Sequence, residues 1–343
     1  MKRNYAFEVI KFLSAIVIAV LHYNYLLVPQ GYLCVEIFFI IAGFLLYCRR
    51  DSYQKRDLPS IIISKVETVY FYWLLLLLIG LVYQVHFRNI KYTLIEWIIN
   101  ILKSMMFFPY IFGADSNWLP FAQLWFIPVW LIASILWIIF FKSNIRHKKE
   151  KILLIGLVLI GIVYNANENH AVNLTVEHNI GCFSFGMFRG LMDTSIGVLV
   201  AMLYEYKGRC FGKLSGFVNL CSIIMMIIII KSEKLGCRAD YVFILLCSLM
   251  VYCMGDGSGI MTYILRYGGG VLRKLTLLSG PIYYFHYVVI LFFDVIGIER
   301  SSGKNLFIYI VLCILIAYVG MRVEKLERKG IKYLCSISKY NSD

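Results

Sequence analysis

Residues 6–28 read AFEVIKFLSAIVIAVLHYNYLLV, and this stretch decides the fold of the chain. An apolar helix needs roughly 20 residues to cross about 30 Å of hydrocarbon, and this stretch is long enough. Glu8 and Lys11 interrupt its apolar run, and no small-residue cleavage pattern follows it. We therefore expect a retained transmembrane helix rather than a removable signal peptide.

Similar apolar blocks recur along the whole chain. Hydrophobic residues make up 60% of the 343 residues, charged residues make up 16%, and the mean hydropathy is +0.75. An ordinary globular chain is nearer to half apolar and a quarter charged. The sequence predicts an all-α, polytopic bundle of about ten transmembrane helices in a single domain over 1–343, with helices over 6–322 and a short basic tail over 323–343. The expected spans are 6–28, 31–48, 66–86, 121–141, 152–165, 186–206, 214–230, 240–255, 275–293 and 305–322.

The net charge of +14 is explained by the placement of the basic residues. With the N-terminus inside, the inner segments hold 24 of the 34 Lys and Arg residues and the outer segments hold eight; Lys11 and Arg189 lie within spans. This bias is the positive-inside pattern, so we expect both termini in the cytoplasm and the plasma membrane as the location. The expected partner of the basic residues is the lipid bilayer and not nucleic acid.

The longest outer segment, from about 87 to 120, contains a second kind of helix. Residues 91–108, KYTLIEWIINILKSMMFF, alternate polar and apolar positions at helical spacing. The pattern indicates an interfacial helix that lies on the outer leaflet.

Ionisable side chains inside spans are costly and are therefore candidates for a functional site. Lys11 and His22 are eleven residues apart, which is three helical turns plus about 20°, so they share one helix face about 16 Å apart. Glu8 lies one turn before Lys11 and can pair with it. In the alternative interpretation, Lys11 extends to the inner interface and His22 only binds a neighbouring helix.

Two further candidates lie in other spans. Glu36 follows the outer turn before the second span, where it can orient a histidine, bind a substrate hydroxyl, or stay partly hydrated. His286 lies in an apolar, aromatic run and can act in catalysis or only in packing. We expect no metal site.

These residues resemble a known family. Lys11 and His22 resemble the Arg/Lys-x10-His pattern in the first helix of the acyltransferase-3 membrane O-acyltransferases. Residues 31–46, GYLCVEIFFIIAGFLL, are similar to that family's Gly-x-x-Gly-Val-Asp/Glu-x-Phe-Phe-x-x-Ser-Gly-Phe block, with Cys34 for the second Gly and Ala42 for the Ser.

Three later segments resemble the same family in the same order. Residues 123–134, QLWFIPVWLIAS, are similar to its Leu-Trp-Phe segment, and residues 188–203, FRGLMDTSIGVLVAML, are similar to its Arg-then-Gly span. Residues 279–289, SGPIYYFHYVV, resemble its Ser-x-x-x-Tyr-x-x-His close. The ordered resemblance covers nearly the whole chain.

One family motif is incomplete. Where the family has Arg-x-x-Arg to contact the acyl donor, this chain has Lys65-Val66-Glu67-Thr68. Basic residues of the second inner segment are candidates to supply the missing charge, although positive-inside topology alone also explains them; they are Arg49, Arg50, Lys55 and Arg56.

The resemblance implies an acyltransferase that moves an acyl group, expected to be acetyl, from cytoplasmic acetyl-CoA to a hydroxyl of an extracytoplasmic or lipid-linked glycan. Acetyl-CoA would be a co-substrate, with no bound cofactor. The acceptor would be a capsule, exopolysaccharide or cell-wall sugar, and other cell-envelope biosynthesis proteins are expected partners.

The same resemblance suggests a role for each candidate residue. His22 would act as the general base, or form a covalent acyl-histidine. Lys11 and Glu8 would line the donor path, and Arg189 or His286 would stabilise the oxyanion.

Two other functions remain open at this point. The first is transport of a lipid-linked saccharide, although the paired repeats and broken helices common in transporters are not seen. The second is a conduit that passes the acyl group to a separate outer transferase.

Overall fold

The computed structural model describes residues 4–87, 91–113, 121–166, 172, 178–208, 211, 214–233, 238–255 and 269–340. The described α-helices are α1 (Tyr5–Tyr23), α2 (Cys34–Cys48), α3 (Arg50–Gln54), α4 (Leu58–Phe87), α5 (Leu94–Met105), α6 (Phe108–Phe112), α7 (Phe126–Lys142), α8 (Lys148–Asn165), α9 (Phe185–Lys207), α10 (Ser215–Lys231), α11 (Arg238–Cys253), α13 (Gly269–Leu275), α14 (Ser279–Ile296) and α15 (Gly303–Tyr340). Short 3-10 turns are η1 (Tyr25–Leu27), η2 (Gly31–Leu33), η3 (Ala122–Trp125) and η5 (Thr276–Leu278).

The predicted helical class is confirmed. Within the described residues the strands are limited to β1 (Asn179–Ile180) and β2 (Phe183–Ser184), an antiparallel pair two residues long. Seven described helices are long and apolar enough to cross a membrane, and they include α1, α2, α4, α7, α9, α14 and α15.

The expected count of about ten spans is not confirmed by length and composition. Helices form at the other three expected places, but they are short or charged. The helix α10 has 17 residues and α11 has 16, while α8 opens with Lys148-Lys149-Glu150-Lys151.

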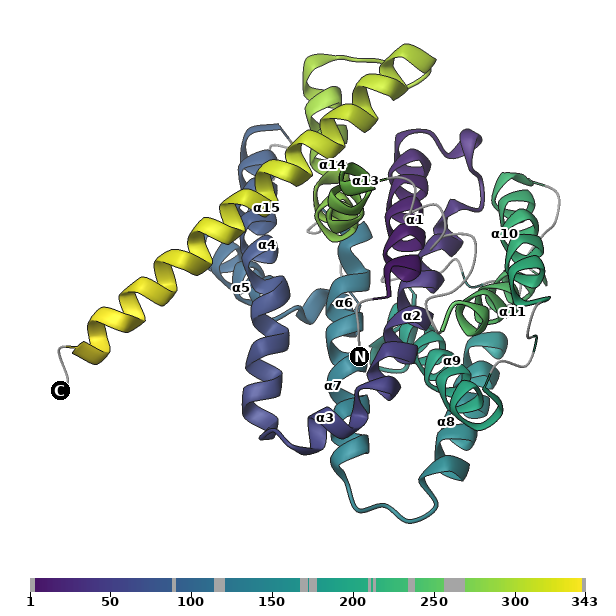
Figure 1. The fold of residues 1–343 in the computed structure, drawn as a ribbon. Coiled ribbons are helices and arrows are strands. Elements are labelled where there is room, and N and C mark those ends of the chain that lie inside the picture. Colours follow the sequence, from purple (N-terminus) through teal and green to yellow (C-terminus); the bar gives the residue numbers. More distant parts are fainter. Residues whose placement is uncertain are drawn as a thin grey trace.

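The helices alternate in direction along the bundle. The helix α3 and the α7–α8 turn lie at one end, and the α14–α15 turn lies at the other (Figure 1). The end that holds α3 carries Arg49, Arg50 and Lys142, and we call it the inner end, and the opposite end the outer end, after the orientation expected from the sequence.

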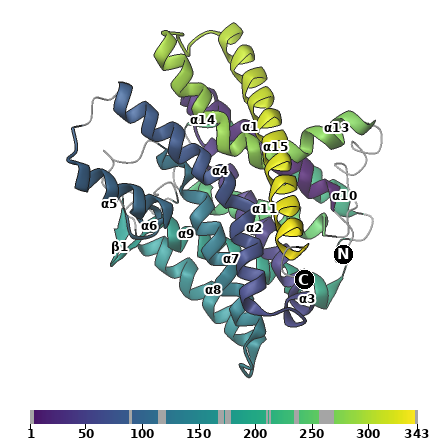
Figure 2. The same ribbon diagram turned by 90° about the vertical axis from the view of Figure 1, so that its left-hand side faces the viewer.

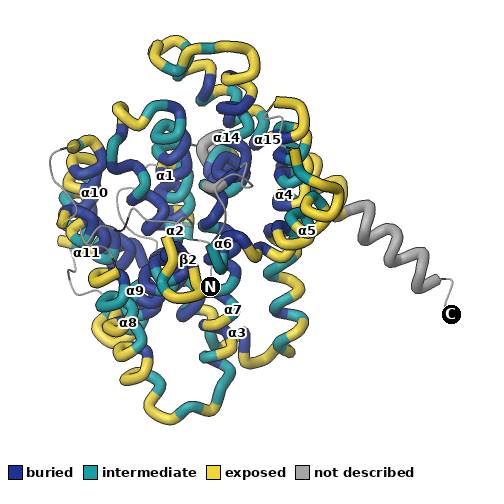
Figure 3. Tube along the Cα trace, turned by 180° about the vertical axis from the view of Figure 1, so that it is seen from behind, coloured by how far each residue is buried: buried dark blue, intermediate teal, exposed yellow. Residues whose placement is uncertain are grey.

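The second helix lies at the centre of the bundle. Of the spanning residues of α2, 72% are buried, whereas only 22% of those of α15 are buried. Figure 2 shows α15 on the outside of the bundle, and Figure 3 shows the buried residues gathered on inner helices such as α2 and α14. Residues on α2 are therefore shielded from lipid by surrounding helices.

Two helix boundaries differ from the sequence expectation. The helix α4 begins at Leu58 rather than at 66, because the Asp57 carboxylate accepts a hydrogen bond from the backbone N–H of Ser60 (2.8 Å). Lys65 is thus inside a helix and not in a loop. At the other end of the chain, α15 continues as a helix through the expected tail to Tyr340.

The expected amphipathic helix in the outer segment is present as α5. A capping box starts it, with Thr93 and Glu96 each bonded to the other's backbone N–H, and it ends before Phe107, which has a left-handed φ of 61°. The Trp73 Nε1 donates to the Ser104 carbonyl (3.0 Å) and ties α5 to α4. One face exposes apolar side chains, which are Leu94, Ile95, Ile98, Ile99 and Leu102.

Glycines bring α2 and α9 into backbone contact. A Cβ added at Gly43 would lie 2.0 Å from the Thr194 carbonyl oxygen, and one added at Gly197 would lie 2.1 Å from the Ile40 carbonyl oxygen. Only glycine allows this separation between the two helices.

We predict that Gly43→Ala destabilises the protein, because the new methyl group forces two central helices apart at a cost of about 1–3 kcal/mol or more. Thermal unfolding of the detergent-purified protein measures the effect. The matched control is Gly161→Ala in α8, where an added Cβ meets nothing within 4 Å. Equal Tm values for Gly43→Ala and wild type would contradict the close contact.

Candidate functional site

A cavity of about 340 Å³ lies toward the outer side of the bundle, and we call it the outer cavity. It is lined by Ile18, Leu21, His22, Tyr32, Val35, Gln123, Trp125, Arg189, Tyr283 and Tyr287. The side-chain amide nitrogen of Gln123 is buried and has no hydrogen-bond partner among the described residues. The outer cavity thus combines aromatic rings with an imidazole, a guanidinium and an amide.

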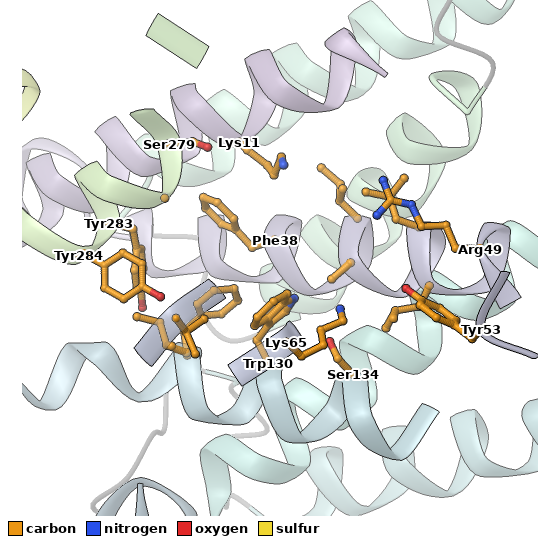
Figure 4. A pocket seen from close by; sticks show the side chains of 18 residues that line it. Lys11, Phe38, Arg49, Tyr53, Lys65, Trp130, Ser134, Ser279, Tyr283 and Tyr284 are labelled. Carbon is orange, nitrogen blue, oxygen red and sulfur yellow. The ribbon is translucent and has the colours of Figure 1, made fainter. Parts of the chain in front are cut away.

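A second cavity, of about 290 Å³, lies toward the inner side, and we call it the inner cavity (Figure 4). Its polar lining residues are Lys11, Arg49, Tyr53, Lys65, Ser134, Ser279, Tyr283 and Tyr284. In the close-up, Tyr283 and Tyr284 lie at one end, and Arg49 and Tyr53 lie at the other (Figure 4). Along α2 the inner cavity reaches from Phe38 to Arg49, a distance of about 16 Å.

The structure brings His22 and His286 together. Their rings stack with centroids 5.2 Å apart and an angle of 27°. His286 is fully buried, and its Nδ1 lies 2.8 Å from the Tyr283 carbonyl oxygen. A nitrogen that faces a carbonyl must carry the proton, so Nε2 is left as an acceptor, and it has no partner within the described part of the chain. His22 is the more exposed of the two and lines the outer cavity.

Tyr309 fixes the spacing of the histidine pair. Its hydroxyl lies 3.1 Å from the Ala19 carbonyl oxygen in α1 and 3.2 Å from the His286 carbonyl oxygen in α14. The contact joins three helices at the level of the two imidazoles. Tyr309 could not be selected from the sequence, because its role depends on which helices are neighbours.

Arg189 and Glu36 form a buried ion pair between α9 and α2. The Arg189 Nε donates to Glu36 Oε1 (2.7 Å), and its Nη2 contacts the same oxygen. Their side chains are 1% and 0% exposed. The guanidinium also lies 5.0 Å from the centre of the Trp125 ring. Glu36 therefore holds Arg189 at the outer cavity, and the structure does not pair Glu36 with a histidine.

Asp193 is a further buried acid that the sequence reasoning missed. It lies one helical turn after Arg189 and is 0% exposed. Its carboxyl group lies at hydrogen-bonding distance from that of Glu36, so the two buried acids share one site beside the Arg189 guanidinium. A charge inside an apolar span was the signal that identified Arg189, and the same signal applies to Asp193.

Three cations surround the inner cavity. Lys11 Nζ lies 2.9 Å from Glu8 Oε1, and Lys65 Nζ lies 4.8 Å from the centre of the Trp130 ring. Arg49 lines the inner end beside Tyr53, where burial raises the pKa of the Tyr53 phenol and the positive charge of Arg49 partly offsets this. The phenol is thus neutral near pH 7.

Arg50 has a different environment from Arg49. It binds Glu205 Oε1 (2.5 Å) and lies over the Tyr47 ring, so it joins α3 to α9 and does not line the inner cavity.

The two ends of the incomplete motif, Lys65 and Thr68, have different environments. Lys65 lines the inner cavity, whereas Thr68 is exposed and bonds the Lys65 carbonyl (2.6 Å). The basic residue that the motif lacks beside Lys65 therefore has a counterpart in Arg49, which lines the same cavity from the end of α2.

This arrangement can bind a polar group at either side of the bundle and place an imidazole between them. Apolar spanning helices that enclose a buried polar site define an integral membrane protein. A match to the acyltransferase-3 family, described as an acyltransferase domain, covers residues 4–322, so the chain belongs to this family. The protein is a membrane acyltransferase. No curated protein and no solved structure matches the chain.

We predict that Arg189→Met strongly destabilises the protein, because Glu36 is then left buried without its cation, at a cost of about 3–5 kcal/mol. The double variant Arg189→Met with Glu36→Gln removes both charges, and we expect it to recover much of the loss. Thermal unfolding of the three proteins tests this. A double variant no more stable than the single one would contradict a mutual ion pair.

Proposed function

We propose that the protein transfers an acetyl group from cytoplasmic acetyl-CoA to a hydroxyl of an extracytoplasmic glycan, in the plasma membrane and with both termini in the cytoplasm. The main support is the helix α1. It carries His22 to the outer cavity and Lys11 to the inner cavity, on one face of the helix. Donor and acceptor can then approach the imidazole from opposite sides of the membrane.

The inner cavity suits a CoA thioester. Arg49 and Lys65 provide positive charge near the inner end, where the phosphates of CoA would stay close to the cytoplasm. The hydroxyl of Ser134 is fully buried in the cavity wall and lacks a partner in the part of the chain described, so it is available to an amide of the pantetheine arm. The apolar walls and the ring of Trp130 suit the arm itself.

The outer cavity suits a sugar. The rings of Tyr32, Trp125 and Tyr287 offer apolar faces, and Gln123 offers an amide. Arg189 is already neutralised by Glu36, so the outer cavity carries no strong net charge that would select an acidic group. These features favour a hydroxyl-rich, neutral part of a capsule, exopolysaccharide or cell-wall glycan. Partner proteins would then be enzymes of cell-envelope synthesis.

In the proposed reaction, His22 removes the proton of the acceptor hydroxyl as that oxygen attacks the thioester carbonyl. A C–O bond forms, the C–S bond breaks, and the proton passes to the departing thiolate. Arg189 lines the cavity in which the oxyanion develops and can stabilise it. His286 contacts His22 rather than lining either cavity, so we assign it to positioning.

We predict that His22→Ala abolishes acetyl transfer without removing the protein from the membrane, because no other base lines the outer cavity among the described residues. The measurement is the O-acetyl content of surface glycan in deletion cells complemented with wild type or variant. The matched control is His147→Ala, since His147 is exposed at the inner α7–α8 turn.

Wild-type acetylation in a well-expressed His22→Ala strain would remove His22 from the mechanism. Loss of the whole glycan from the surface of the deletion strain, with no change in the acetyl content of what remains, would favour a transporter instead. Accumulation of a separate outer protein that carries the acyl group as an ester would favour the conduit.

We predict that Arg49→Ala raises the KM for acetyl-CoA by about tenfold, because a charge-assisted contact with a phosphate is lost. The control is Arg56→Ala, since Arg56 bonds the Ser60 hydroxyl (3.3 Å) and does not line the inner cavity. Initial rates against donor concentration test this. Equal KM values for the two variants would place the donor elsewhere.

A further inference from the structure

The inner and outer cavities meet at one level of the bundle. On α1 the lining residue Lys11 belongs to the inner cavity and Ile18 to the outer one. On α2 the change falls between Val35 and Phe38. The segment that joins η3 to α7 shows the same change, at Trp125 and Phe126. The two cavities therefore lie end to end.

Tyr283 is the one described residue that lines both cavities. Its ring packs against Phe126 (5.2 Å between centroids) and Phe38 (6.1 Å), and those two rings lie 5.6 Å apart. The three rings form a partition between the cavities, and we call it the aromatic partition.

A hydrogen bond holds the partition in place. The Tyr283 hydroxyl donates to the backbone carbonyl of Gln123 (2.8 Å). The side-chain amide of the same Gln123 lines the outer cavity with its nitrogen unpartnered among described residues. One residue thus contacts the partition through its backbone and offers a free donor to the acceptor site.

We propose that Tyr283 and Gln123 determine that the acyl group goes to a glycan hydroxyl and not to water. The inference rests on the proposed function. With the partition closed, the thioester stays in the inner cavity, away from water in the outer cavity. An acceptor that binds the Gln123 amide shifts η3, releases Tyr283 and lets the acyl carbon reach the level of His22.

The step that the partition suppresses is hydrolysis. Water would attack the thioester carbonyl, a C–O bond would form and the C–S bond would break. One proton of the water would pass to sulfur and the other to solvent, leaving acetate and the free thiol of CoA. Such a reaction wastes the donor, and water is far more abundant than any glycan. Excluding water until the acceptor is bound is a known requirement for group transfer.

The test is release of CoA thiol and acetate from acetyl-CoA by the purified full-length protein without any glycan. We expect Tyr283→Phe to raise this hydrolysis by about tenfold, the effect of losing one hydrogen bond. Tyr252→Phe is the matched control, because it removes another buried phenol that donates to a backbone carbonyl, that of Gly208, away from both cavities.

Two further variants keep the test decisive. Phe38→Ala opens the aromatic partition without altering Tyr283, and we expect hydrolysis to rise as well. Gln123→Ala removes the amide that the acceptor would bind, so we expect acetyl transfer to glycan in cells to fall by about tenfold.

The role of the partition is overturned if Tyr283→Phe and Phe38→Ala both hydrolyse acetyl-CoA at the wild-type rate while the wild-type protein still transfers acetyl. The proposed function is unaffected by that result. A different result would overturn the proposed function. If wild type transfers no acetyl in cells and no variant releases CoA thiol, the proposed function itself is overturned, and this inference with it.

Discussion

The backbone contact between α2 and α9 is the constraint on which the rest of the structure depends. Gly43 and Gly197 remove the side chains that would separate the two helices, and each faces a carbonyl of the other helix. Farther out along the same pair, Glu36 and Arg189 bind each other. In hydrocarbon, close packing and satisfied polar groups hold helices together, because there is no water to drive them. The pair thus provides a rigid wall for the site.

The positions of α7 and η3 depend on the α2–α9 pair. A Cβ at Gly190 would lie 2.3 Å from Val129 and 2.7 Å from the Phe39 ring, so α7 also packs closely on α9. Trp125, just before α7, lies against the Arg189 guanidinium. The position of η3, and hence of Gln123, follows from these contacts. A change at the α2–α9 contact would therefore reach the outer cavity without altering any residue that lines it.

Hydropathy alone predicted the helical class and most spans, because transfer into lipid depends on composition over about 20 residues. The shared face of Lys11 and His22 was predictable for the same local reason, since it depends only on helix geometry. The start of α4 was missed because the residues after the Asp57 cap include Pro59, Ser60, Ser64 and Lys65, which lower the hydropathy there. The distinction between Arg49 and Arg50 was not predictable, since neighbouring residues differ by about 100° around a helix and only packing decides which one faces the cavity.

The contact between the two cavities was not predictable from the sequence. Tyr283 and Phe126 lie in two segments that resemble the family, 279–289 and 123–134, but only the assembled bundle shows that their rings meet. The donor-side charge shows the same dependence on three-dimensional position. Arg49 at the end of α2 and Lys65 on α4 face one space, although they come from different segments. The proposed donor phosphates would need a cation at that place, and either α2 or α4 can supply one.

Under the proposed function, Tyr283 would also separate two electrical compartments. With the thioester inside and the hydroxyl outside, each turnover would move an acyl group outward and replace it on sulfur with a proton. A proton that travels inward from the acceptor by way of His22 makes the turnover electroneutral. A proton lost outside and replaced from the cytoplasm makes one positive charge cross outward, which costs about 2.3 kcal/mol at 100 mV. Under the proposed function, the route of this proton past His22 would therefore decide whether acyl transfer is independent of the membrane potential.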